Sequence, residues 1–464
     1  MTDTCAAVST AIGKAGISVI RVSGNEAVNI AERIFKPASG KKISDVAANT
    51  AVFGTVFDKK GEKIDTALVT VFKAPRSYTG EDTVEISCHG SVVGTSMVLA
   101  AIFDAGARQA LPGEFTKRAF INGKLDLTQA EAVADLLDAE NAEQLRLFSA
   151  QLEGGLGKKI KACSDKITEM LAAVYAYIDY PDEDMSDMSD EELEVAITGV
   201  KKELSKLASS YSSGTAITKG VETAIVGAPN TGKSTFFNLL AGFDRAIVTD
   251  IAGTTRDVIT ESVNVAGIKL LISDTAGIRE TDDAVEKIGV ERSKNAIEEC
   301  GLCIAVFDGS RALSEDDVVF AEKAAFLAKS KNVVAIINKT DIAEENLLSQ
   351  TKQSLENAGL DNIILMSAKA GNGKTDFEEI IRKFYPEAES GIRSGQIITN
   401  ARQYAAVSRA SDSLDRALSA MKSLTRDMAG LDLEEALQAL CEADGRQVSE
   451  QIVSTIFSRF CVGK

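Results

Sequence analysis

The residues with the clearest chemical meaning form a glycine-rich run in the middle of the chain. Residues 227–234 read GAPNTGKS, which has the spacing of a phosphate-binding loop. An apolar run, TAIVG, precedes it and a helical pattern, FFNLL, follows it, which is the order of elements that such a loop requires. Glycines let several backbone N–H groups point at one phosphate, and the helix N-terminus adds a favourable partial charge. We expect nucleotide contacts from Asn230, Thr231, Gly232, Lys233, Ser234 and Thr235.

Two later segments predict that the base of the nucleotide is guanine. Asp341 ends the run NKTD, which follows the apolar strand pattern VVAIIN, and SAK follows the next such pattern. A carboxylate here can accept two hydrogen bonds from guanine, whereas adenine offers no such pair, so the sequence favours GTP over ATP. NKTD alone would also fit a surface turn. The expected base contacts are Asn338, Lys339, Thr340, Asp341, Ser367, Ala368 and Lys369.

Two segments between these motifs predict a loop that responds to the terminal phosphate. DTAG follows the strand pattern KLLIS, where an acidic group can hold the magnesium shell and a glycine N–H can meet the phosphate. TDIAGTT lies before it, and a threonine hydroxyl there would complete magnesium coordination only while GTP is bound. The residues expected to contact GTP are Thr249, Asp250, Ile251, Ala252, Gly253, Thr254, Thr255, Asp274, Thr275, Ala276 and Gly277.

The residue after DTAG is Ile278, whereas a Ras-like GTPase has a water-orienting glutamine there. An isoleucine cannot orient water, so hydrolysis requires another device. The downstream acids are candidates for this role: Glu280, Asp282, Asp283 and Glu286. Asn230 adds a carbonyl ligand to the loop, which could help to bind a monovalent cation where an arginine finger would otherwise place charge.

The elements that would position these motifs suggest a multidomain α+β and α/β protein. Residues 1–120 alternate strand and helix patterns and predict a compact α+β domain, whereas residues 121–217 show helical spacing. Residues 218–385 alternate strands and helices, which predicts an α/β domain with a largely parallel sheet. Residues 386–464 return to helices, so we expect one helical bundle interrupted by an insertion. The expected N-terminal elements are strands at 17–22, 66–72 and 83–87 and a helix at 97–105.

Composition narrows the class of protein. Hydrophobic residues make up 45% and charged residues 26%, which is typical of a soluble globular protein, and neither a membrane span nor a secretory signal is visible. The odd number of cysteines, seven, favours a reducing cytoplasm. Cys300 and Cys303 begin an apolar run without a second pair, which favours a buried strand edge over zinc. Ser189 is a plausible N-cap before Glu191 and Glu192.

The charge of the chain is uneven. The net charge of −17 argues against nucleic acid, but residues 1–124 hold 15 basic and 12 acidic side chains. If the chain has an RNA surface, we expect it near the N-terminal third. Aromatic residues make up only 5%, with no tryptophan, so stacking platforms for bases are a poor expectation.

Three further segments make the chain resemble the MnmE/TrmE family of tRNA-modification GTPases along nearly its full length. The nucleotide motifs alone would fit several GTPases related to translation factors. ISVIRVSG at 17–24 is similar to the family's N-terminal signature, and LPGEFTKRAFINGKLDL at 111–127 to its domain junction. CVGK at 461–464 is similar to the family's Cys-x-Gly-Lys ending.

That resemblance implies an N-terminal folate-binding and dimerisation domain, a discontinuous α-helical domain and an inserted Ras-like P-loop G domain. It implies a homodimer that works with an FAD-dependent partner of the GidA/MnmG type in a heterotetramer or larger complex. Together they would add a carboxymethylaminomethyl or aminomethyl group to C5 of the wobble uridine of certain tRNAs. The one-carbon unit would come from 5-formyl- or methylene-tetrahydrofolate, in the cytoplasm and away from any membrane.

The resemblance also assigns residue roles. Potassium would meet Asn230, Thr249, Ile251 and Thr254, and magnesium would meet Ser234 and Thr255. Glu286 would orient the attacking water through a bridging water, and closure of two G domains around potassium and GTP would couple hydrolysis to dimerisation. The folate contacts would be Arg21, Glu85, Lys124 and Lys464. From the residues alone, Arg21 and Lys124 could pair with the glutamate tail of a folate, and Glu85 could accept from its pterin ring.

The sequence allows more than one role for Cys461 and for His89. Cys461 does not fit a lipidation box, but it fits either an apolar thiol packed beside Phe460 or a thiol near the modification chemistry. His89 has no second histidine for a triad, so we expect a structural or folate-pocket hydrogen bond.

The chain departs from the family's pattern at Ile12-Gly13 and at Ser91, both in the expected folate-binding domain, and conservatively at Val462. The alternative function is a regulatory or ribosome-assembly GTPase switch without modification chemistry. Such a switch would have the same nucleotide motifs but no use for a folate site or the Cys-Gly-Lys ending.

Overall fold

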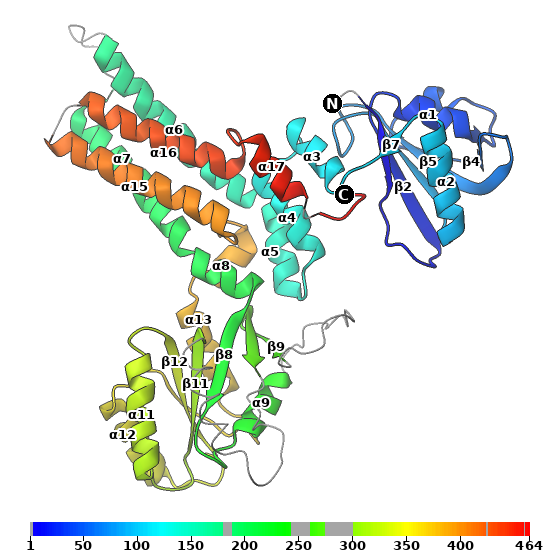
Figure 1. Cartoon of the computed structure of the whole chain (residues 1–464). Coiled ribbons are helices and arrows are strands. Elements are labelled where there is room, and N and C mark those ends of the chain that lie inside the picture. Colours follow the sequence, from blue (N-terminus) through cyan, green and yellow to red (C-terminus); the bar gives the residue numbers. More distant parts are fainter. Residues whose placement is uncertain (1–2, 180–187, 243–259, 274–299, 424–425, 459) are drawn as a thin grey trace. The chain divides into compact units, whose positions relative to one another are not determined.

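The computed structural model describes residues 3–179, 188–242, 260–273, 300–423, 426–458 and 460–464 (Figure 1). Contacts between Cα atoms divide the chain into two units. One unit combines Met1–Asp135 with Gln438–Lys464, and the other is Leu136–Leu437. Within the described residues, no helix is both long and apolar enough to cross a membrane.

The N-terminal unit contains a seven-stranded sheet with the order β3-β4-β5-β6-β2-β1-β7. Helices α1 (Ala27–Ile34) and α2 (Val92–Asp104) share a core with the sheet, because alternate strand residues turn Ile20, Val69 and Ile86 toward Ile30 and Ile102. Only the β1–β7 pairing is parallel among these strands. The strands are β1 (Cys5–Val8), β2 (Ile17–Ser23), β3 (Phe35–Pro37), β4 (Thr50–Phe57), β5 (Lys63–Phe72), β6 (Thr83–His89) and β7 (Arg108–Gln109), with a short 3-10 turn at Ile43–Asp45.

The same unit contains helices from both ends of the chain. α3 (Glu114–Ile121) and α17 (Glu450–Phe457) pack through Phe120 and Phe457, whose ring centroids lie 6.3 Å apart. Gly113 allows this approach, because a Cβ there would lie 2.6 Å from Phe457 O. The C-terminal segment is therefore part of the N-terminal unit. α4 (Leu127–Leu137) follows α3.

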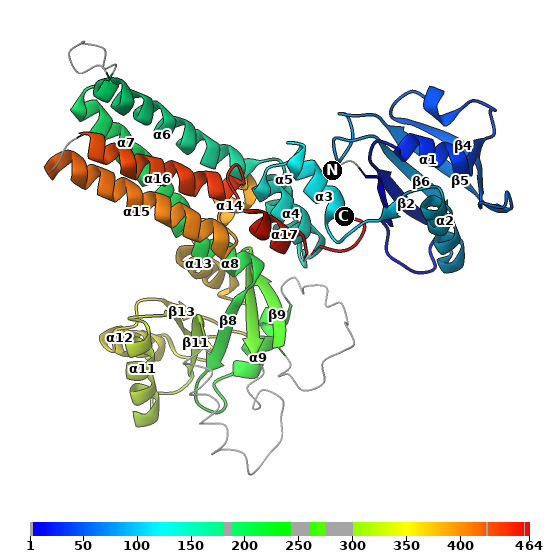
Figure 2. The ribbon, with the colours of Figure 1, turned by 45° about the horizontal axis from the view of Figure 1, so that its top comes forward.

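The second unit begins and ends with long helices that pack together. α7 (Asp190–Ser209) lies beside α15 (Ala401–Ser423), and Ser205 Oγ is 3.2 Å from Ser411 Oγ (Figures 1 and 2). The expected N-cap is confirmed: Ser189 and Glu192 form a reciprocal capping box at the start of α7. Helical segments from before and after the α/β region thus share one bundle. The other helices of the second unit are α5 (Ala142–Leu152), α6 (Gly155–Asp179), α8 (Tyr211–Thr218) and α14 (Ala388–Ser394). α16 (Arg426–Asp444) begins in this unit and ends in the N-terminal unit.

Between these helices lies a six-stranded sheet with the order β13-β12-β11-β8-β10-β9. The expectation of a largely parallel sheet is confirmed, because only β9 and β10 pair antiparallel. The carboxyl ends of parallel strands meet at one edge, which is where ligands bind in such sheets. The strands are β8 (Val221–Val226), β9 (Thr260–Val265), β10 (Ile268–Ser273), β11 (Leu302–Asp308), β12 (Asn332–Asn338) and β13 (Ile363–Leu365).

Hydrophobic clusters cover both faces of this sheet, which explains its continuous apolar strands. On one face Phe236 and Phe377 meet edge to face with centroids 5.6 Å apart. On the other, Phe307 packs with Cys300 and Cys303, both buried, so the prediction of a buried strand edge is confirmed. The helices of this region are α9 (Lys233–Ala241), α11 (Glu315–Leu327), α12 (Glu345–Asn357) and α13 (Lys374–Phe384).

Candidate functional site

The phosphate-binding loop joins the end of β8 to the start of α9. Asn230, at an exposed point of the loop, has φ +61°, and Gly232, just before the helix, has φ +92°. Lys233 folds back over the loop, and its Nζ donates to Gly227 O at 3.0 Å and to Ala228 O at 2.8 Å. Burial lowers the pKa of Lys233, since the charged form loses water there. The two carbonyl oxygens are neutral acceptors. A phosphate would offer this ammonium an anionic partner and therefore a stronger hydrogen bond.

Asn338 connects this loop to the segments that were expected to recognise the base. Its Nδ2 donates to Thr231 O at 2.9 Å, and its Oδ1 accepts from Ala368 N at 3.0 Å. The side chain is almost fully buried, so both contacts are shielded from water. One amide therefore links three loops, and its two contacts span 107 and 30 residues of sequence.

Asp341 lies beside the third of these loops. Ser367 Oγ donates to Asp341 Oδ1 at 2.7 Å and accepts from Ala370 N at 3.2 Å. Asp341 itself is exposed, so its carboxylate can meet a ligand. The structure thus brings the NKTD and SAK segments together at the edge where β8, β11 and β12 end.

The sequence-predicted nucleotide residues divide into two groups. The described ones meet at this edge, with Ser234 and Thr235 exposed on the first turn of α9. The others lie outside the described residues: Thr249, Asp250, Ile251, Ala252, Gly253, Thr254, Thr255, Asp274, Thr275, Ala276, Gly277 and Glu286.

Sequence reasoning did not single out Asp308, which contacts this site. Its Oδ2 lies 2.7 Å from Lys339 Nζ, and its carboxylate is buried at the end of β11. The available signal was an acidic residue that ends an apolar run directly before Gly309, the same arrangement that places Asn338 at the end of β12.

A second group of predicted residues meets in the N-terminal unit. Arg21 on β2 and Glu85 on β6 are cross-strand partners, with Arg21 Nη2 2.8 Å from Glu85 Oε1. The guanidinium also lies over the rings of Tyr78 and Phe115, at 5.0 and 5.4 Å from their centroids. In this structure Arg21 and Glu85 therefore pair with each other through the groups that we expected to contact folate. Tyr78 Oη and Thr116 Oγ1 share a hydrogen bond of 2.9 Å, which links this cluster to α3.

The C-terminal segment contacts the same part of the unit. Phe115 N donates to Lys464 O at 3.1 Å, and Ser9 Oγ donates to Gly463 O at 3.0 Å. Cys461 is exposed, so the interpretation of a packed apolar thiol beside Phe460 is wrong. Lys124, another expected folate contact, donates from its Nζ to Pro75 O at 3.1 Å.

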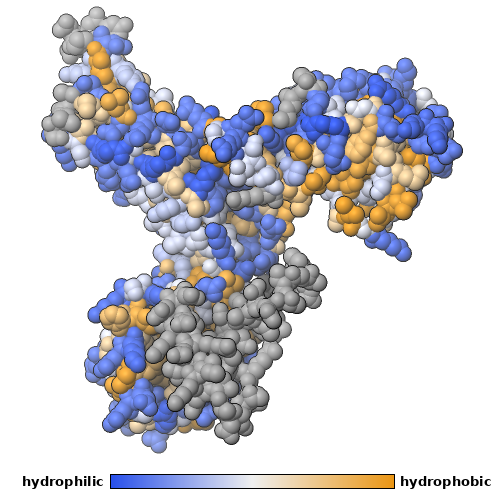
Figure 3. Space-filling view, in the orientation of Figure 1, coloured by the Kyte–Doolittle hydropathy of each residue, from blue (hydrophilic) through white to orange (hydrophobic). Residues whose placement is uncertain are grey.

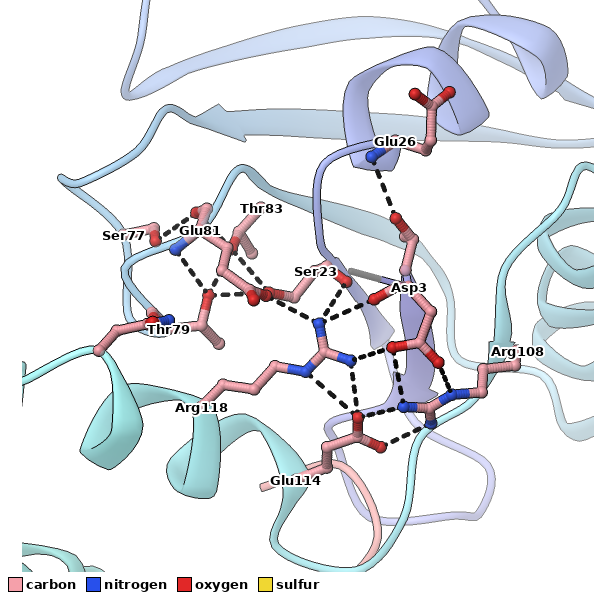
Figure 4. Close-up of polar contacts among 12 residues, drawn as sticks. Asp3, Ser23, Glu26, Ser77, Thr79, Glu81, Thr83, Arg108, Glu114 and Arg118 are labelled. Carbon is pink, nitrogen blue, oxygen red and sulfur yellow. Dashed lines mark hydrogen bonds and ion pairs between the residues drawn. The ribbon is translucent and has the colours of Figure 1, made fainter. Parts of the chain in front are cut away.

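A charge cluster around the buried side chains of Glu114 and Arg118 fixes the start of α3 (Figure 4). Arg118 is 1% exposed, and its guanidinium lies 2.7 Å from Glu114 Oε1 and 2.8 Å from Glu81 Oε2. Asp3 and Arg108 complete the cluster, with Arg108 Nη1 donating to Glu114 at 2.7 Å. Burial would raise the pKa of Glu114, but hydrogen bonds from Arg108, the Leu111 N–H and Arg118 lower it to about 2. Because α3 also carries Phe115 and Thr116, this cluster positions the residues around Arg21.

His89 makes a structural hydrogen bond, as expected, with a residue of the neighbouring strand β5. Its Nδ1 lies 2.8 Å from Asp65 Oδ1, and its backbone N–H donates to Asp65 Oδ2 at 2.9 Å. The ring is 72% exposed at the end of β6. This is a hydrogen-bonded pair at a sheet edge.

Two family models match successive parts of the chain. Residues 4–124 match the family model described as GTP-binding protein TrmE N-terminus, and residues 127–461 match the MnmE helical domain. The tRNA modification GTPase MnmE of Clostridioides difficile (strain 630) is 42% identical over 463 residues, which cover 100% of this chain and 99% of the relative. The chain belongs to the MnmE family. MnmE of Thermoanaerobacter pseudethanolicus is 40% identical over 468 residues, with 100% and 99% coverage.

Solved structures that resemble this MnmE-family chain match only part of it. A variant of Aquifex aeolicus Era bound to GDP and AlF4− is 24% identical with a TM-score of 0.27, covering 41% of this chain and 65% of Era. The G domain of FeoB from T. maritima is 18% identical with a TM-score of 0.25, covering 35% of this chain and 96% of that domain.

Proposed function

We propose that the chain is a GTP hydrolase that acts in tRNA modification, as the names of its MnmE relatives state for those proteins. The observation that carries this proposal is the pair of contacts made by Asn338, to Thr231 O and from Ala368 N. They join the phosphate-binding loop to the SAK segment, whose Ser367 contacts Asp341, and this supports binding of a guanine nucleotide.

Magnesium fits the donors of this site. Ser234 presents a hydroxyl on the first turn of α9, directly after Lys233, and hydroxyl oxygen is a hard ligand of the kind that magnesium prefers. We propose Thr255 as the second protein ligand. When bound, the ion would neutralise charge that develops on the phosphates during hydrolysis.

We also propose potassium activation. Asn230 is exposed in the loop with a left-handed backbone, so its side-chain carbonyl can point away from the loop. Thr249, Ile251 and Thr254 would complete the potassium site, and Glu286 would orient the attacking water. Closure of two G domains over GTP would then accompany hydrolysis.

For the modification chemistry we propose a tetrahydrofolate site in the N-terminal unit. Arg21, Glu85, Lys124 and Lys464 all belong to this unit, and main-chain contacts join Lys464 to the helix that carries Phe115. A folate with 5-formyl or methylene substitution would supply the one-carbon unit. The exposed Cys461 is the candidate thiol near this chemistry.

The proposed partners are a second copy of the chain, an FAD-dependent protein of the GidA/MnmG type, and tRNA. Apolar side chains gather on the surface of the N-terminal unit (Figure 3). In this unit, Phe53 and Leu68 are cross-strand neighbours on β4 and β5 that are 56% and 48% exposed. Such a patch favours a protein interface, and we assign it to the homodimer. All seven cysteines lie within the described residues and none forms a disulfide, which supports a cytoplasmic reaction.

The proposed domains are a folate-binding and dimerisation domain (1–120), a helical domain in two parts (121–217 and 386–464) and a G domain (218–385). The contact between α7 and α15 supports a shared helical domain. The decisive experiment is mass spectrometry of tRNA wobble uridines from cells that lack this protein. We expect the carboxymethylaminomethyl or aminomethyl group to disappear and to return with the wild-type gene but not with Lys233→Ala. Unchanged uridines together with defective ribosomes would favour the assembly switch instead.

A further inference from the structure

Lys339 adopts a backbone conformation that few lysines have. Its φ is +66°, in the left-handed region, which costs a residue with a Cβ on the order of 1 kcal/mol. Its Nζ lies 2.7 Å from Asp308 Oδ2, and the lysine side chain is 30% exposed. The position of Lys339 is therefore determined partly by a residue outside the nucleotide motifs.

Asp308 is itself held firmly. Its Oδ1 accepts from Ser310 N at 3.0 Å and from Ser310 Oγ at 2.6 Å, so both carboxylate oxygens have partners. Burial would raise the pKa of Asp308, but hydrogen bonds from Lys339 and Ser310 outweigh burial and lower it. The group is therefore an anion at neutral pH, and its side chain is only 9% exposed.

The backbone around Asp308 is equally constrained. Asp308 and Asn338 are register partners at the ends of β11 and β12, and Gly309 N donates to Asn338 O at 2.8 Å. A Cβ on Gly309 would lie 2.8 Å from Ile337 Cγ2 and 2.9 Å from Asn338 O, so only glycine allows this approach. The aspartate thus reaches Lys339 from a rigid strand end.

We propose that Asp308 is a positioning residue for the guanine nucleotide, because it holds the Lys339 side chain beside Asn338 and Asp341 before the nucleotide binds. This inference rests on the proposed GTP site. A free lysine loses up to about 2 kcal/mol of rotamer entropy when it is immobilised. An ion pair that already orders the side chain removes part of that loss from the binding step, which is how preorganisation increases affinity.

The test measures binding of N-methylanthraniloyl-GDP, with Mg2+, to the full chain. Asp308→Asn keeps an oxygen for Ser310 but removes the charge that faces Lys339. We expect affinity to fall about 3- to 10-fold, the size expected for one immobilised side chain. The preference for guanine over xanthine nucleotides should not change, because Asp341 is intact.

A double-mutant cycle separates positioning from a structural effect. Lys339→Met keeps an unbranched apolar stem without the charge and should weaken binding by a similar factor. In the Lys339→Met background, Asp308→Asn should change affinity less than twofold. Equal weakening by Asp308→Asn in both backgrounds would overturn the inference. Normal affinity of Lys339→Met would also overturn it, even if Asp308→Asn failed to fold.

Asp317 provides a matched control in the same region. It is 3% exposed, lies 2.7 Å from Arg311 Nη1 and caps α11 through Ser314. Asp317→Asn should lower the melting temperature and leave the affinity for the labelled GDP unchanged. Wild-type affinity in Asp308→Asn, or equal losses of affinity in Asp308→Asn and Asp317→Asn, would overturn the positioning role of Asp308. Neither result would contradict the proposed GTP site. A wild-type chain that binds no GDP would overturn the proposed function together with this inference.

Discussion

A Cβ atom on Gly232 would lie 2.2 Å from Asn338 Nδ2, so no side chain can fit between the phosphate-binding loop and the end of β12. Asn338 uses this close approach to donate to Thr231 O at 2.9 Å. The close approach of the phosphate-binding loop to the end of β12 therefore requires a glycine at position 232.

Gly232→Ala should abolish most nucleotide binding. The new methyl group would collide with Asn338, and φ of +92° would strain any residue other than glycine. Strain of this kind costs about 1–3 kcal/mol, and loss of the Asn338 contact adds a similar amount. We expect GTP affinity to fall at least about 30-fold in a fluorescence titration.

The control for this change is Gly199→Ala. Gly199 lies on an exposed part of α7 with no atom within 4 Å of its would-be Cβ. Alanine in a helix interior is more favourable than glycine, so the free energy of unfolding should rise by about 0.5–1 kcal/mol. If Gly232→Ala bound GTP as well as Gly199→Ala does, the close approach would have no functional meaning.

Asp341→Asn should change the base that the chain prefers. The amide can no longer accept two hydrogen bonds from guanine, but it can donate to the extra carbonyl of xanthine. Ser367 Oγ lies 2.7 Å from Asp341 Oδ1 and can keep the side chain in place. Competition of GTP and XTP for the labelled nucleotide measures the switch. An unchanged guanine preference would refute the assignment of Asp341 to the base.

Replacing potassium with sodium should slow GTP turnover by about 10-fold or more, the effect of losing one well-placed charge in a transition state. Asn230 is the described residue expected to hold the ion, so Asn230→Ala should make the two rates equal and low. The measurement is phosphate release at constant ionic strength. Equal wild-type rates in the two salts would remove potassium from the mechanism and leave nucleotide binding intact.

The sequence predicted the elements of the α/β region well because its strands are buried on both faces. β11 and β12 have continuous apolar runs, and each run ends one residue before the end of its strand. The start of α2 in the N-terminal unit was predicted less accurately. It was expected from residue 97, but α2 begins at Val92, because Ser91 Oγ accepts from Gly94 N and overrides two β-branched residues.

The candidate site was predictable only as far as its contacts are local in sequence. The phosphate-binding loop and NKTD have fixed spacings, so their residues could be named in advance. The contact of Asn338 with Thr231 spans 107 residues, and that of Lys339 with Asp308 spans 31. The pairing of Arg21 with Glu85 depends on the register of β2 against β6, which no motif encodes.

Glu114→Gln should destabilise the N-terminal unit in a way that depends on pH. Both Arg118 and Arg108 would keep their charges and lose a carboxylate, and removing one partner of a buried ion pair costs about 3–5 kcal/mol. The folded-state pKa of Glu114 is about 2, below the ordinary value of 4.5. Its contribution is therefore complete above pH 4.5 and is lost as the pH falls toward 2.

Thermal unfolding of wild type and variant at pH 7 and near pH 2 measures this dependence. The difference in melting temperature should be large at pH 7 and should shrink toward zero in acid. Glu62→Gln, at an exposed turn of the same unit, should change stability by less than about 0.5 kcal/mol at either pH. A difference between wild type and Glu114→Gln that stays constant with pH would show that the carboxylate charge of Glu114 does not hold α3 in place.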